Sequence, residues 1–222
     1  MALRAVIWDF DGTICDTYPA IAGAINAALA SFSVATSLEH VVTLASISLE
    51  YCMRTLATEF AIPYAQLDAA FRETYQSIQL CDQPPFPGLA ELCRQLVAVG
   101  VQQFIVTHRR RESLLRLLST HGLDVYFTHS IAADDGFPRK PAPDAMLHLL
   151  STYAIAPSDA LVIGDRDFDM LAGQAAGVST CLFRATFPEI IPTRTIWNYA
   201  ELADIVPAAA IGTPASMFEA GG

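Results

Sequence analysis

A chain of 222 residues is long enough for one large domain, or for a core domain with a smaller insert. Its hydrophobic fraction of 53% suits a buried core, but no stretch approaches the roughly 20 unbroken apolar residues of a membrane helix. The formal net charge of −10 argues against a nucleic-acid partner. We therefore expect a globular protein that binds neither a membrane nor nucleic acid.

The N-terminus and the cysteines bear on the compartment. A strand is predicted almost at once, so no charged segment followed by an apolar signal sequence is visible. The five cysteines are an odd number and form no C-x-x-C pair, which favours free thiols in a reducing environment. We expect a cytoplasmic protein that is a monomer or a homodimer.

The first predicted element is a strand at 5–8, and D-F-D-G-T follows it at 9–13. Asp9 and Asp11 would then lie together at the tip of a buried parallel strand, where sites in such folds are found. Two carboxylates held together repel each other unless a cation or a shared proton offsets them. The pair therefore predicts a site that needs positive charge.

The next part of the chain carries apolar residues at helical spacing and has no strand signal. We predict helices over 19–32, 38–60 and 64–80. A proline-rich connector at 81–88 marks the far boundary of this block. The block predicts an inserted small all-helical domain, which we place at residues 15–85.

From residue 88 onward, strands and helices alternate. Helices are predicted over 88–99, 112–119, 143–153, 168–176 and 200–206, and strands over 103–107, 126–131, 160–164 and 179–183. Repeated strand–helix units predict an α/β fold with a doubly wound parallel sheet. This core would comprise residues 1–14 and 86–206, and residues 207–222 would be a loose tail.

Polar residues stand at four predicted strand ends: Asp9 with Asp11, Thr107, the loop that holds Lys140, and Asp165 followed by Asp169. Because the tips of parallel strands share one edge, these side chains can converge. Hard oxygen ligands suit Mg²⁺, and the assembly favours phosphoryl transfer through a carboxylate nucleophile. Lys140 is the only lysine in a chain with 13 basic residues.

The sequence resembles a known family in four places. They are D-F-D-G-T at 9–13, Thr107 after an apolar strand, R-K-P-A-P-D at 139–144 and G-D-R-D-F-D at 164–169. In order and spacing they are similar to the four motifs of the haloacid dehalogenase superfamily, and the helical insert resembles the subclass with a cap after the first motif. Proteins grouped as phosphoglycolate phosphatases look most similar. The resemblance implies a Rossmann-like core and a Mg²⁺-dependent phosphatase that acts on a small phosphorylated metabolite.

The resemblance also implies a role for each carboxylate. Asp9 would attack phosphorus and form an aspartyl-phosphate. Asp11 would protonate the leaving oxygen and later deprotonate the hydrolytic water. Mg²⁺ would be held by the Asp9 carboxylate, the Asp11 backbone carbonyl and Asp165, with Asp169 as a further ligand or as a support to one.

The remaining positions would contact the phosphate. Thr107 and the backbone N–H after it would hold phosphate oxygens, and Lys140 would neutralise the nucleophile and the transferring group. His108 stands where the family often has Asn, so a contact with substrate and a polar residue without chemistry are equally good explanations. The arginines at 109–111 could attract an anionic substrate. A solvated start to the next helix is the commoner explanation of such a run.

Two other functions compete with a phosphatase. Sugar-phosphate mutases share all four motifs but return the phosphoryl group to a substrate instead of water. A phospho-accepting signalling domain would also combine Mg²⁺, paired acids, a threonine and a lysine. Such a domain needs only about 120 uninterrupted residues and places its acceptor on a middle strand. The acid pair on the first strand and the insert after it argue against that alternative.

Overall fold

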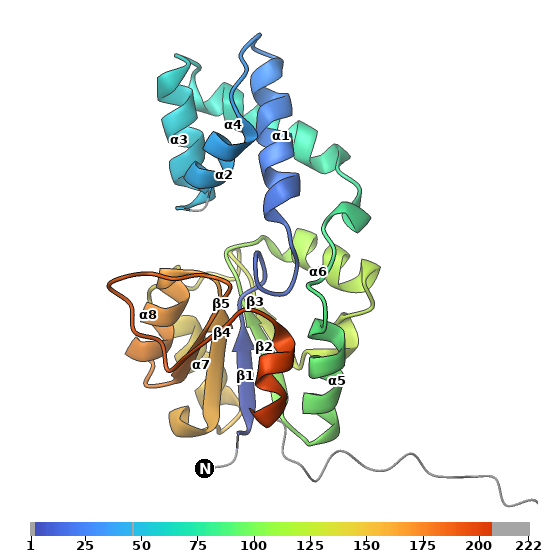
Figure 1. The fold of residues 1–222 in the computed structure, drawn as a ribbon, viewed down its shortest axis with the longest axis vertical. Helices are drawn as coiled ribbons and strands as arrows, with labels where there is room; N and C mark the ends of the chain where they lie inside the picture. Colours follow the sequence, from blue (N-terminus) through green and yellow to red (C-terminus); the bar gives the residue numbers. More distant parts are fainter. Residues whose placement is uncertain (1–2, 46, 206–222) are drawn as a thin grey trace, which may run out of the picture.

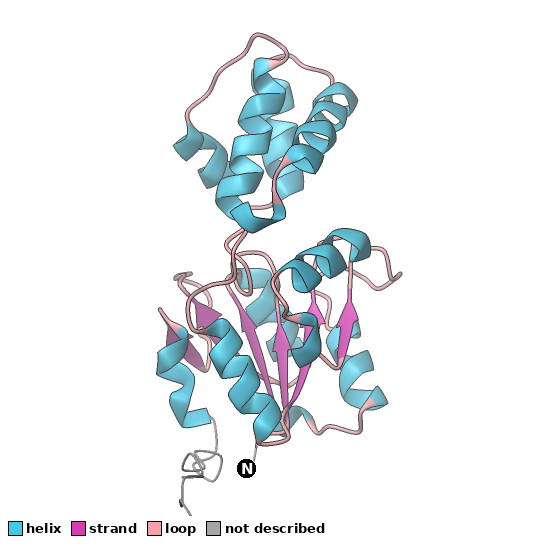
Figure 2. Cartoon of the chain, turned by 90° about the vertical axis from the view of Figure 1, so that its right-hand side faces the viewer, coloured by secondary structure: helices cyan, strands magenta, loops and turns pink. Residues whose placement is uncertain are grey.

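The computed structural model describes residues 3–45 and 47–205, which form a sheet-containing part and a helical part joined by a narrow neck (Figure 1). The carboxyl ends of the strands point towards the neck and the helical part (Figure 2). Within the described residues, no helix is both long enough and apolar enough to cross a membrane.

Six strands form one sheet in the order β3-β2-β1-β4-β5-β6, and every neighbouring pair is parallel. The strands are β1 (Ala5–Trp8), β2 (Gln102–Val106), β3 (His129–Ile131), β4 (Ala160–Gly164), β5 (Ser179–Phe183) and β6 (Arg194–Ile196). β1 lies in the middle of the sheet between β2 and β4. This arrangement confirms the predicted doubly wound α/β fold.

The sheet is covered on both faces. α5 (Leu89–Ala98), α6 (Arg111–Thr120) and the 3₁₀ helix η4 (Tyr199–Ile205) pack on one face. α7 (Asp144–Thr152) and α8 (Asp167–Ala175) pack on the other. Because successive residues of a strand point to opposite faces, Val6 and Trp8 belong to the first core while Ala5 and Ile7 belong to the second. Burial on both faces explains why β1 is a continuous apolar run.

The helical part has its own hydrophobic core. It consists of α1 (Tyr18–Ala30), α2 (Leu38–Ala45), α3 (Leu49–Glu59) and α4 (Tyr64–Ser77), followed by the short 3₁₀ helix η1 (Leu80–Asp82). Its core residues include Ile25, Leu29 and Leu56, which are fully buried. A separate core supports the predicted division into a catalytic core and a cap, which we retain as a proposal.

The prediction of a single helix over 38–60 was wrong. Two helices are present instead: α2 ends at Ala45 and α3 begins at Leu49. The Ser48 hydroxyl accepts a hydrogen bond from the backbone N–H of Tyr51 at 3.0 Å, so Ser48 caps the new helix. Serine is a preferred residue at this position because it satisfies a backbone donor that the helix leaves unpaired.

The two crossings of the neck lie side by side. The backbone N–H of Asp16 donates to the carbonyl of Pro84 at 2.9 Å, and the N–H of Phe86 donates to the carbonyl of Ile14 at 3.0 Å. The outgoing and returning segments are therefore hydrogen-bonded to each other where the chain leaves the sheet.

Three further differences from the predictions concern short elements. β6 was not predicted, because three residues are too few to show an alternating pattern. The strand predicted over 126–131 is shortened by a 3₁₀ turn, η2 (Asp124–Tyr126). The predicted helix over 200–206 is the 3₁₀ helix η4. Residue 206 and the predicted tail at 207–222 lie outside the described residues.

One polar side chain inside the core of the sheet is predicted to matter for stability. Gln103 is fully buried, accepts a hydrogen bond from Trp8 Nε1 at 3.2 Å and donates one to the carbonyl of Cys93 at 2.9 Å. We expect Gln103→Leu to lower the free energy of unfolding in urea by about 1–3 kcal/mol, because the indole N–H then lacks a partner. Gln102→Leu, at the partly exposed neighbouring position, is the control and should stay within about 0.5 kcal/mol. Equal losses of stability in the two variants would contradict a stabilising role for the buried hydrogen bonds of Gln103.

Candidate active site

Three carboxylates meet at the carboxyl edge of the sheet. Asp9 follows β1, Asp165 follows β4, and Asp169 lies in the first turn of α8. Each offers an oxygen atom, and these oxygens lie within 4.8 Å of one another. All three side chains are buried. The convergence that the strand order suggests is therefore present for these residues.

Glycines allow this close approach. Gly12 has φ of +78°, and a Cβ atom built there would lie less than 3 Å from Asp165 and from the ring of Tyr18. At Gly164, a Cβ atom would lie 2.5 Å from the side chain of Asp169. A side chain at either position would push apart the segments that bring the carboxylates together.

The buried ammonium of Lys140 is surrounded by oxygen. Its Nζ donates to Asp9 Oδ1 at 2.5 Å and to the carbonyl of Val106 at 2.8 Å, and it pairs with Asp169 Oδ1 at 2.6 Å. Lys140 thus makes hydrogen bonds at the ends of β1 and β2 and an ion pair at the start of α8. The only lysine of the chain thus binds the predicted nucleophile, and it also pairs with Asp169.

Burial and mutual repulsion govern the charges of this cluster. Burial raises the pKa of Asp9 well above its usual range, and the charges of Asp169 and Asp165 add to the effect while Lys140 opposes it. Burial likewise raises the pKa of Asp165 to about 7. For Lys140 burial alone would lower the pKa, but Asp169 and Asp9 outweigh it and the pKa rises. One ammonium therefore leaves the three acids short of positive charge.

The cluster fits a hard divalent cation. Its donor atoms are carboxylate oxygens from two strand ends and one helix start, which suits Mg²⁺. The uncompensated negative charge is what such a cation would offset. Asp9, Asp165 and Asp169 are the residues that would hold it. The carboxylate of Asp11, whose predicted contribution was its backbone carbonyl, lies outside this group of three.

The side chain of Asp11 is held by a different set of donors. Its Oδ1 accepts a hydrogen bond from the Thr17 hydroxyl at 2.7 Å. The guanidinium of Arg109 grips both carboxylate oxygens, with Nε at 3.1 Å from Oδ1 and 3.2 Å from Oδ2. Asp9 and Asp11 therefore have different surroundings. Asp9 lies beside Lys140 and two further acids, whereas Asp11 lies beside Arg109.

The interpretation of the arginine run as a solvated helix start was wrong for its first member. Arg109 is buried, with 9% of its surface exposed. Arg110 is exposed, and Arg111 pairs with Asp135 outside the carboxylate cluster. A run of three arginines carries no signal that separates the buried one from its neighbours, because the distinction depends on which loop residue turns towards Asp11.

Thr107 and His108 both lie at the end of β2. Thr107 is buried, and its hydroxyl accepts a hydrogen bond from the backbone N–H of Arg109 at 3.0 Å. The His108 ring stacks on Phe168 with ring centres 5.1 Å apart, and its buried Nε2 has no hydrogen-bond partner among the described residues. Burial, with help from Lys140 and Arg139, lowers the pKa of His108 to about 3. The imidazole is therefore neutral and has a free polar atom.

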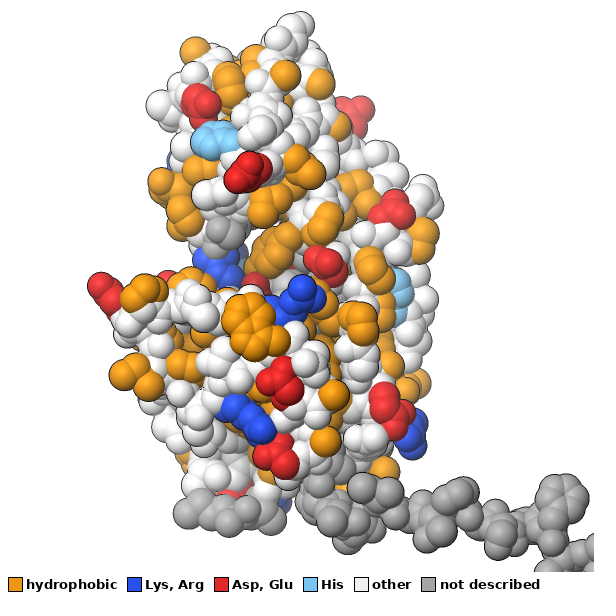
Figure 3. Space-filling model, in the orientation of Figure 1, with side chains coloured by type: hydrophobic (Ala, Val, Ile, Leu, Met, Phe, Trp, Pro, Cys, Tyr) orange, Lys and Arg blue, Asp and Glu red, His pale blue; other side chains and the backbone are white. Residues whose placement is uncertain are grey.

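Three residues of the helical part reach this edge of the sheet. The Tyr18 hydroxyl donates to Asp165 Oδ2 at 2.8 Å, and the carbonyl of Ile47 accepts from Arg166 Nη2 at 2.9 Å. The Tyr75 hydroxyl accepts from Arg109 Nη1 at 2.9 Å. In Figure 3, charged side chains of both signs gather where the helical part meets the sheet part. Sequence reasoning did not find these contacts, because helical spacing does not show which end of a helix faces the site.

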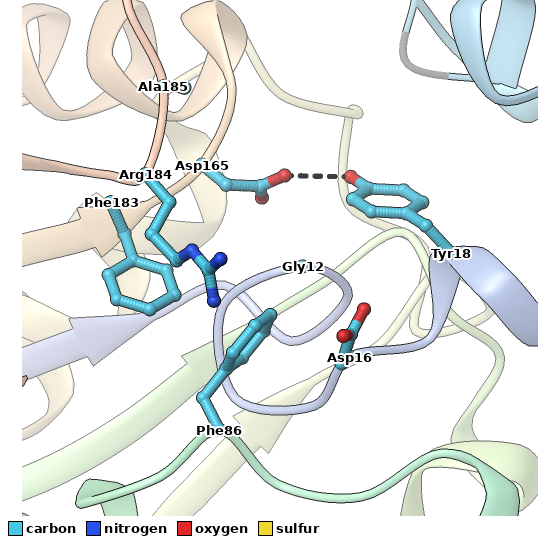
Figure 4. Close-up of a pocket in the computed structure, with 8 residues that line it drawn as sticks. All are labelled: Gly12, Asp16, Tyr18, Phe86, Asp165, Phe183, Arg184 and Ala185. Atoms are coloured by element: carbon cyan, nitrogen blue, oxygen red, sulfur yellow. Dashed lines mark hydrogen bonds between the residues drawn. The ribbon is translucent and has the colours of Figure 1, made fainter. Parts of the chain in front are cut away.

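A pocket of about 200 Å³ opens beside Asp165 at the neck. Figure 4 shows the Asp165 carboxylate hydrogen-bonded to the Tyr18 hydroxyl, next to the loop that holds Gly12. Its other lining residues are Asp16, Phe86, Phe183, Arg184 and Ala185. Asp165 is thus the carboxylate of the cluster that faces this pocket.

The protein thus has a Rossmann-like parallel α/β fold, with buried carboxylates and one lysine at the carboxyl edge of the sheet beneath a helical insert. The sequence model of the haloacid dehalogenase-like hydrolase family matches residues 6–183, and the chain belongs to this family. It is a hydrolase of that family.

Individual relatives extend along most of the chain. A phosphoglycolate phosphatase from Yersinia pestis is 30% identical, with 96% of this chain and 95% of the relative covered. The crystal structure of a hydrolase from Streptococcus pneumoniae is 31% identical, with a TM-score of 0.64 over 83% of this chain and 95% of that one. A predicted phosphoglycolate phosphatase from Haemophilus somnus shares the fold with a TM-score of 0.81 at 21% identity, with 91% and 97% covered.

Binding of Mg²⁺ is predicted to stabilise the protein. A cation that binds the folded cluster at about 100 times its Kd stabilises by roughly 2.7 kcal/mol, which corresponds to about 5 °C or more in Tm for a chain of this size. We expect Asp165→Asn to reduce this rise and the exposed control Asp124→Asn to preserve it. Thermal unfolding with EDTA and with MgCl₂ measures the effect. An unchanged Tm at saturating Mg²⁺ would count against the site.

The neutral His108 predicts a loss of stability in acid. The unfolded histidine has a pKa of about 6.5, whereas the folded one has a pKa of about 3. Between these values the unfolded chain binds one more proton, so stability falls as the pH is lowered from about 6.5 towards 3. We expect His108→Asn to lose less stability than the natural protein between pH 7 and pH 5 in urea unfolding. Parallel curves for the two proteins would rule out a neutral buried imidazole.

Proposed function

We propose that this protein is a Mg²⁺-dependent phosphatase that hydrolyses a small-molecule phosphate monoester through an aspartyl-phosphate on Asp9. The observation that carries the proposal is the buried Asp9 carboxylate, which Lys140 binds at 2.5 Å beside two further acids. Among the described residues, Lys140 is the side chain that donates to Asp9, and it donates to one of the two carboxylate oxygens, so the other oxygen is available to attack phosphorus.

In the first half-reaction, an Asp9 oxygen attacks phosphorus and the bond from phosphorus to the ester oxygen breaks. Asp11 donates a proton to the departing oxygen, so the alcohol product leaves neutral. Lys140, Thr107 and the backbone N–H after Thr107 would hold the phosphoryl oxygens. Mg²⁺, when bound to the carboxylate cluster, would offset the negative charge on the acids and on the transferring group.

In the second half-reaction, Asp11 takes a proton from water. The hydroxide attacks phosphorus, the bond from phosphorus to Asp9 breaks, and inorganic phosphate is released. The separate surroundings of the two acids support this division of roles. Asp11 accepts hydrogen bonds from Thr17 and Arg109 and lies outside the group of carboxylates around Lys140, so it is held apart from the attacking group.

The substrate class is proposed from the relatives and the site together. The Yersinia pestis relative is named as a phosphoglycolate phosphatase, so a small phosphorylated acid of the phosphoglycolate type is the first candidate. The helical part, proposed as a cap over 15–85, would close the site and exclude bulk water. Its contacts with Asp165, Arg109 and Arg166 support that role.

Loss of the nucleophile tests the mechanism. We expect Asp9→Asn to abolish Mg²⁺-dependent release of phosphate from p-nitrophenyl phosphate, since an amide cannot form the acyl phosphate. Asp11→Asn should retain a low activity, with kcat reduced by roughly 10²–10⁴-fold. Asp124→Asn, an exposed acid at η2, is the control and should retain full activity. Normal turnover by the Asp9→Asn protein would refute the mechanism.

A screen of small phosphate monoesters that includes phosphoglycolate would identify the substrate. Colorimetric detection of inorganic phosphate is the measurement, and kcat/KM ranks the substrates. Incubation with a hexose phosphate and its bisphosphate separates a phosphatase from a mutase. Transfer of the phosphoryl group between sugars without release of phosphate would show that the protein is a mutase and not a phosphatase.

A further inference from the structure

The Arg109 guanidinium connects three parts of the structure. It lies in the loop between β2 and α6 and is almost completely buried. Nε and Nη2 donate to the Asp11 carboxylate, while Nη1 donates to the Tyr75 hydroxyl at 2.9 Å and to Ser113 Oγ at 2.7 Å. Asp11 follows β1, Ser113 belongs to α6, and Tyr75 belongs to α4 of the helical part. One side chain thus contacts a predicted catalytic acid and the insert at the same time.

The partner from the helical part is itself held in place. Tyr75 donates its hydroxyl proton to Gln83 Oε1 at 2.5 Å, and Gln83 is 1% exposed. The oxygen of Tyr75 can therefore accept the hydrogen bond from Arg109. The guanidinium carbon also lies 5.4 Å from the centre of the Phe10 ring and 5.7 Å from that of the Tyr75 ring, within the range of a cation–π contact.

The contact between Arg109 and Asp11 is better explained by the orientation that it gives to the Asp11 carboxylate than by a contribution to the stability of the fold. A buried ion pair loses hydration on both partners, so its presence is weak evidence of a stabilising role. A planar guanidinium that grips two carboxylate oxygens does fix the direction of the carboxylate, and a lysine could not do so. Thr17 adds a second donor to the same oxygen of Asp11 at 2.7 Å. The orientation of Asp11 is thus set from two sides.

We propose that Arg109 is a positioning residue that orients the Asp11 carboxylate for proton transfer, and that Tyr75 makes this orientation depend on the seating of the helical part. The inference rests on the proposed function, because Asp11 transfers protons only if the protein cleaves phosphate esters. Arg109 itself acts through Asp11.

The dependence on the leaving group provides the test. An alkoxide needs a proton in order to leave, whereas p-nitrophenolate leaves without one. Displacing a catalytic group by about 1 Å can cost roughly 10²-fold. In Arg109→Gln, we expect kcat/KM for the best alkyl phosphate of the screen to fall about 10–100-fold more than kcat/KM for p-nitrophenyl phosphate. The ratio kcat/KM is the suitable quantity because it covers only the steps up to the first cleavage.

Variants separate the parts of the proposal. Arg109→Lys keeps the positive charge but not the planar guanidinium that binds two oxygens. We therefore expect it to recover only part of the kcat/KM for the alkyl phosphate that Arg109→Gln loses. Tyr75→Phe should produce a smaller loss of the same kind, and this loss should exceed that of Ser113→Ala, which removes the other acceptor of the same nitrogen. Arg111→Gln, two residues away and paired with Asp135, is the control and should leave both substrates unaffected. In an Asp11→Asn background, Arg109→Gln should have little further effect.

The outcomes distinguish this inference from the proposed function. An equal fall for aryl and alkyl substrates in Arg109→Gln would overturn the positioning role while the phosphatase stands. Absence of hydrolysis in the natural protein, or full activity in Asp9→Asn, would refute the function and with it the catalytic role of Arg109. Urea unfolding of Arg109→Gln, Asp11→Asn and the double variant measures the coupling free energy between Arg109 and Asp11, and it does not depend on an activity assay. Additive shifts would overturn the contact on which the inference depends.

Discussion

The ammonium of Lys140 holds together acids that would otherwise repel one another. Asp9 and Asp169 both lie within 2.6 Å of its nitrogen, and the carbonyl at the end of β2 accepts a hydrogen bond from it. Without this charge, two strand ends and the start of α8 would each bring a buried acid to the same place with no compensation. The geometry of the sheet edge and the position of the lysine loop therefore depend on each other.

The same edge also determines how the helical part sits. Its polar contacts with the sheet part include those to Asp165, Arg109 and Arg166, all of which are charged residues of the site or its border. Asp165 is itself a predicted metal ligand, the Arg109 side chain binds Asp11, and the backbone N–H of Arg166 donates to Asp169. A change in the charge or position of the site therefore reaches the helical part directly, through single hydrogen bonds.

Much of the fold could be predicted from the sequence, because the strands of the core are continuous apolar runs. β4 and β5 have the predicted bounds, and β1 was placed correctly. The break between α2 and α3 was missed, since the apolar spacing continues through it and only the capping role of Ser48 marks the new start. β6 was missed because a three-residue edge strand is defined by its neighbour and not by its own pattern.

The positions of the candidate site residues followed from the sequence where a residue stands at or near the end of a strand. Contacts made by other residues did not. Asp9, Asp165 and Lys140 converge as expected, because parallel topology brings strand ends to one edge. Arg109 and Tyr18 were not foreseen as partners of the acids. Their roles arise from contacts between segments far apart in the chain, and no local pattern records such contacts.

The paired crossings at the neck have a consequence for how such a protein can change. Because residues 14–16 and 84–86 are hydrogen-bonded to each other, the helical insert begins and ends at one point of the sheet. A segment whose two ends meet can be lengthened, shortened or exchanged for another without altering the path of the chain through the sheet. The helical part and the sheet part can thus change in evolution largely independently of each other.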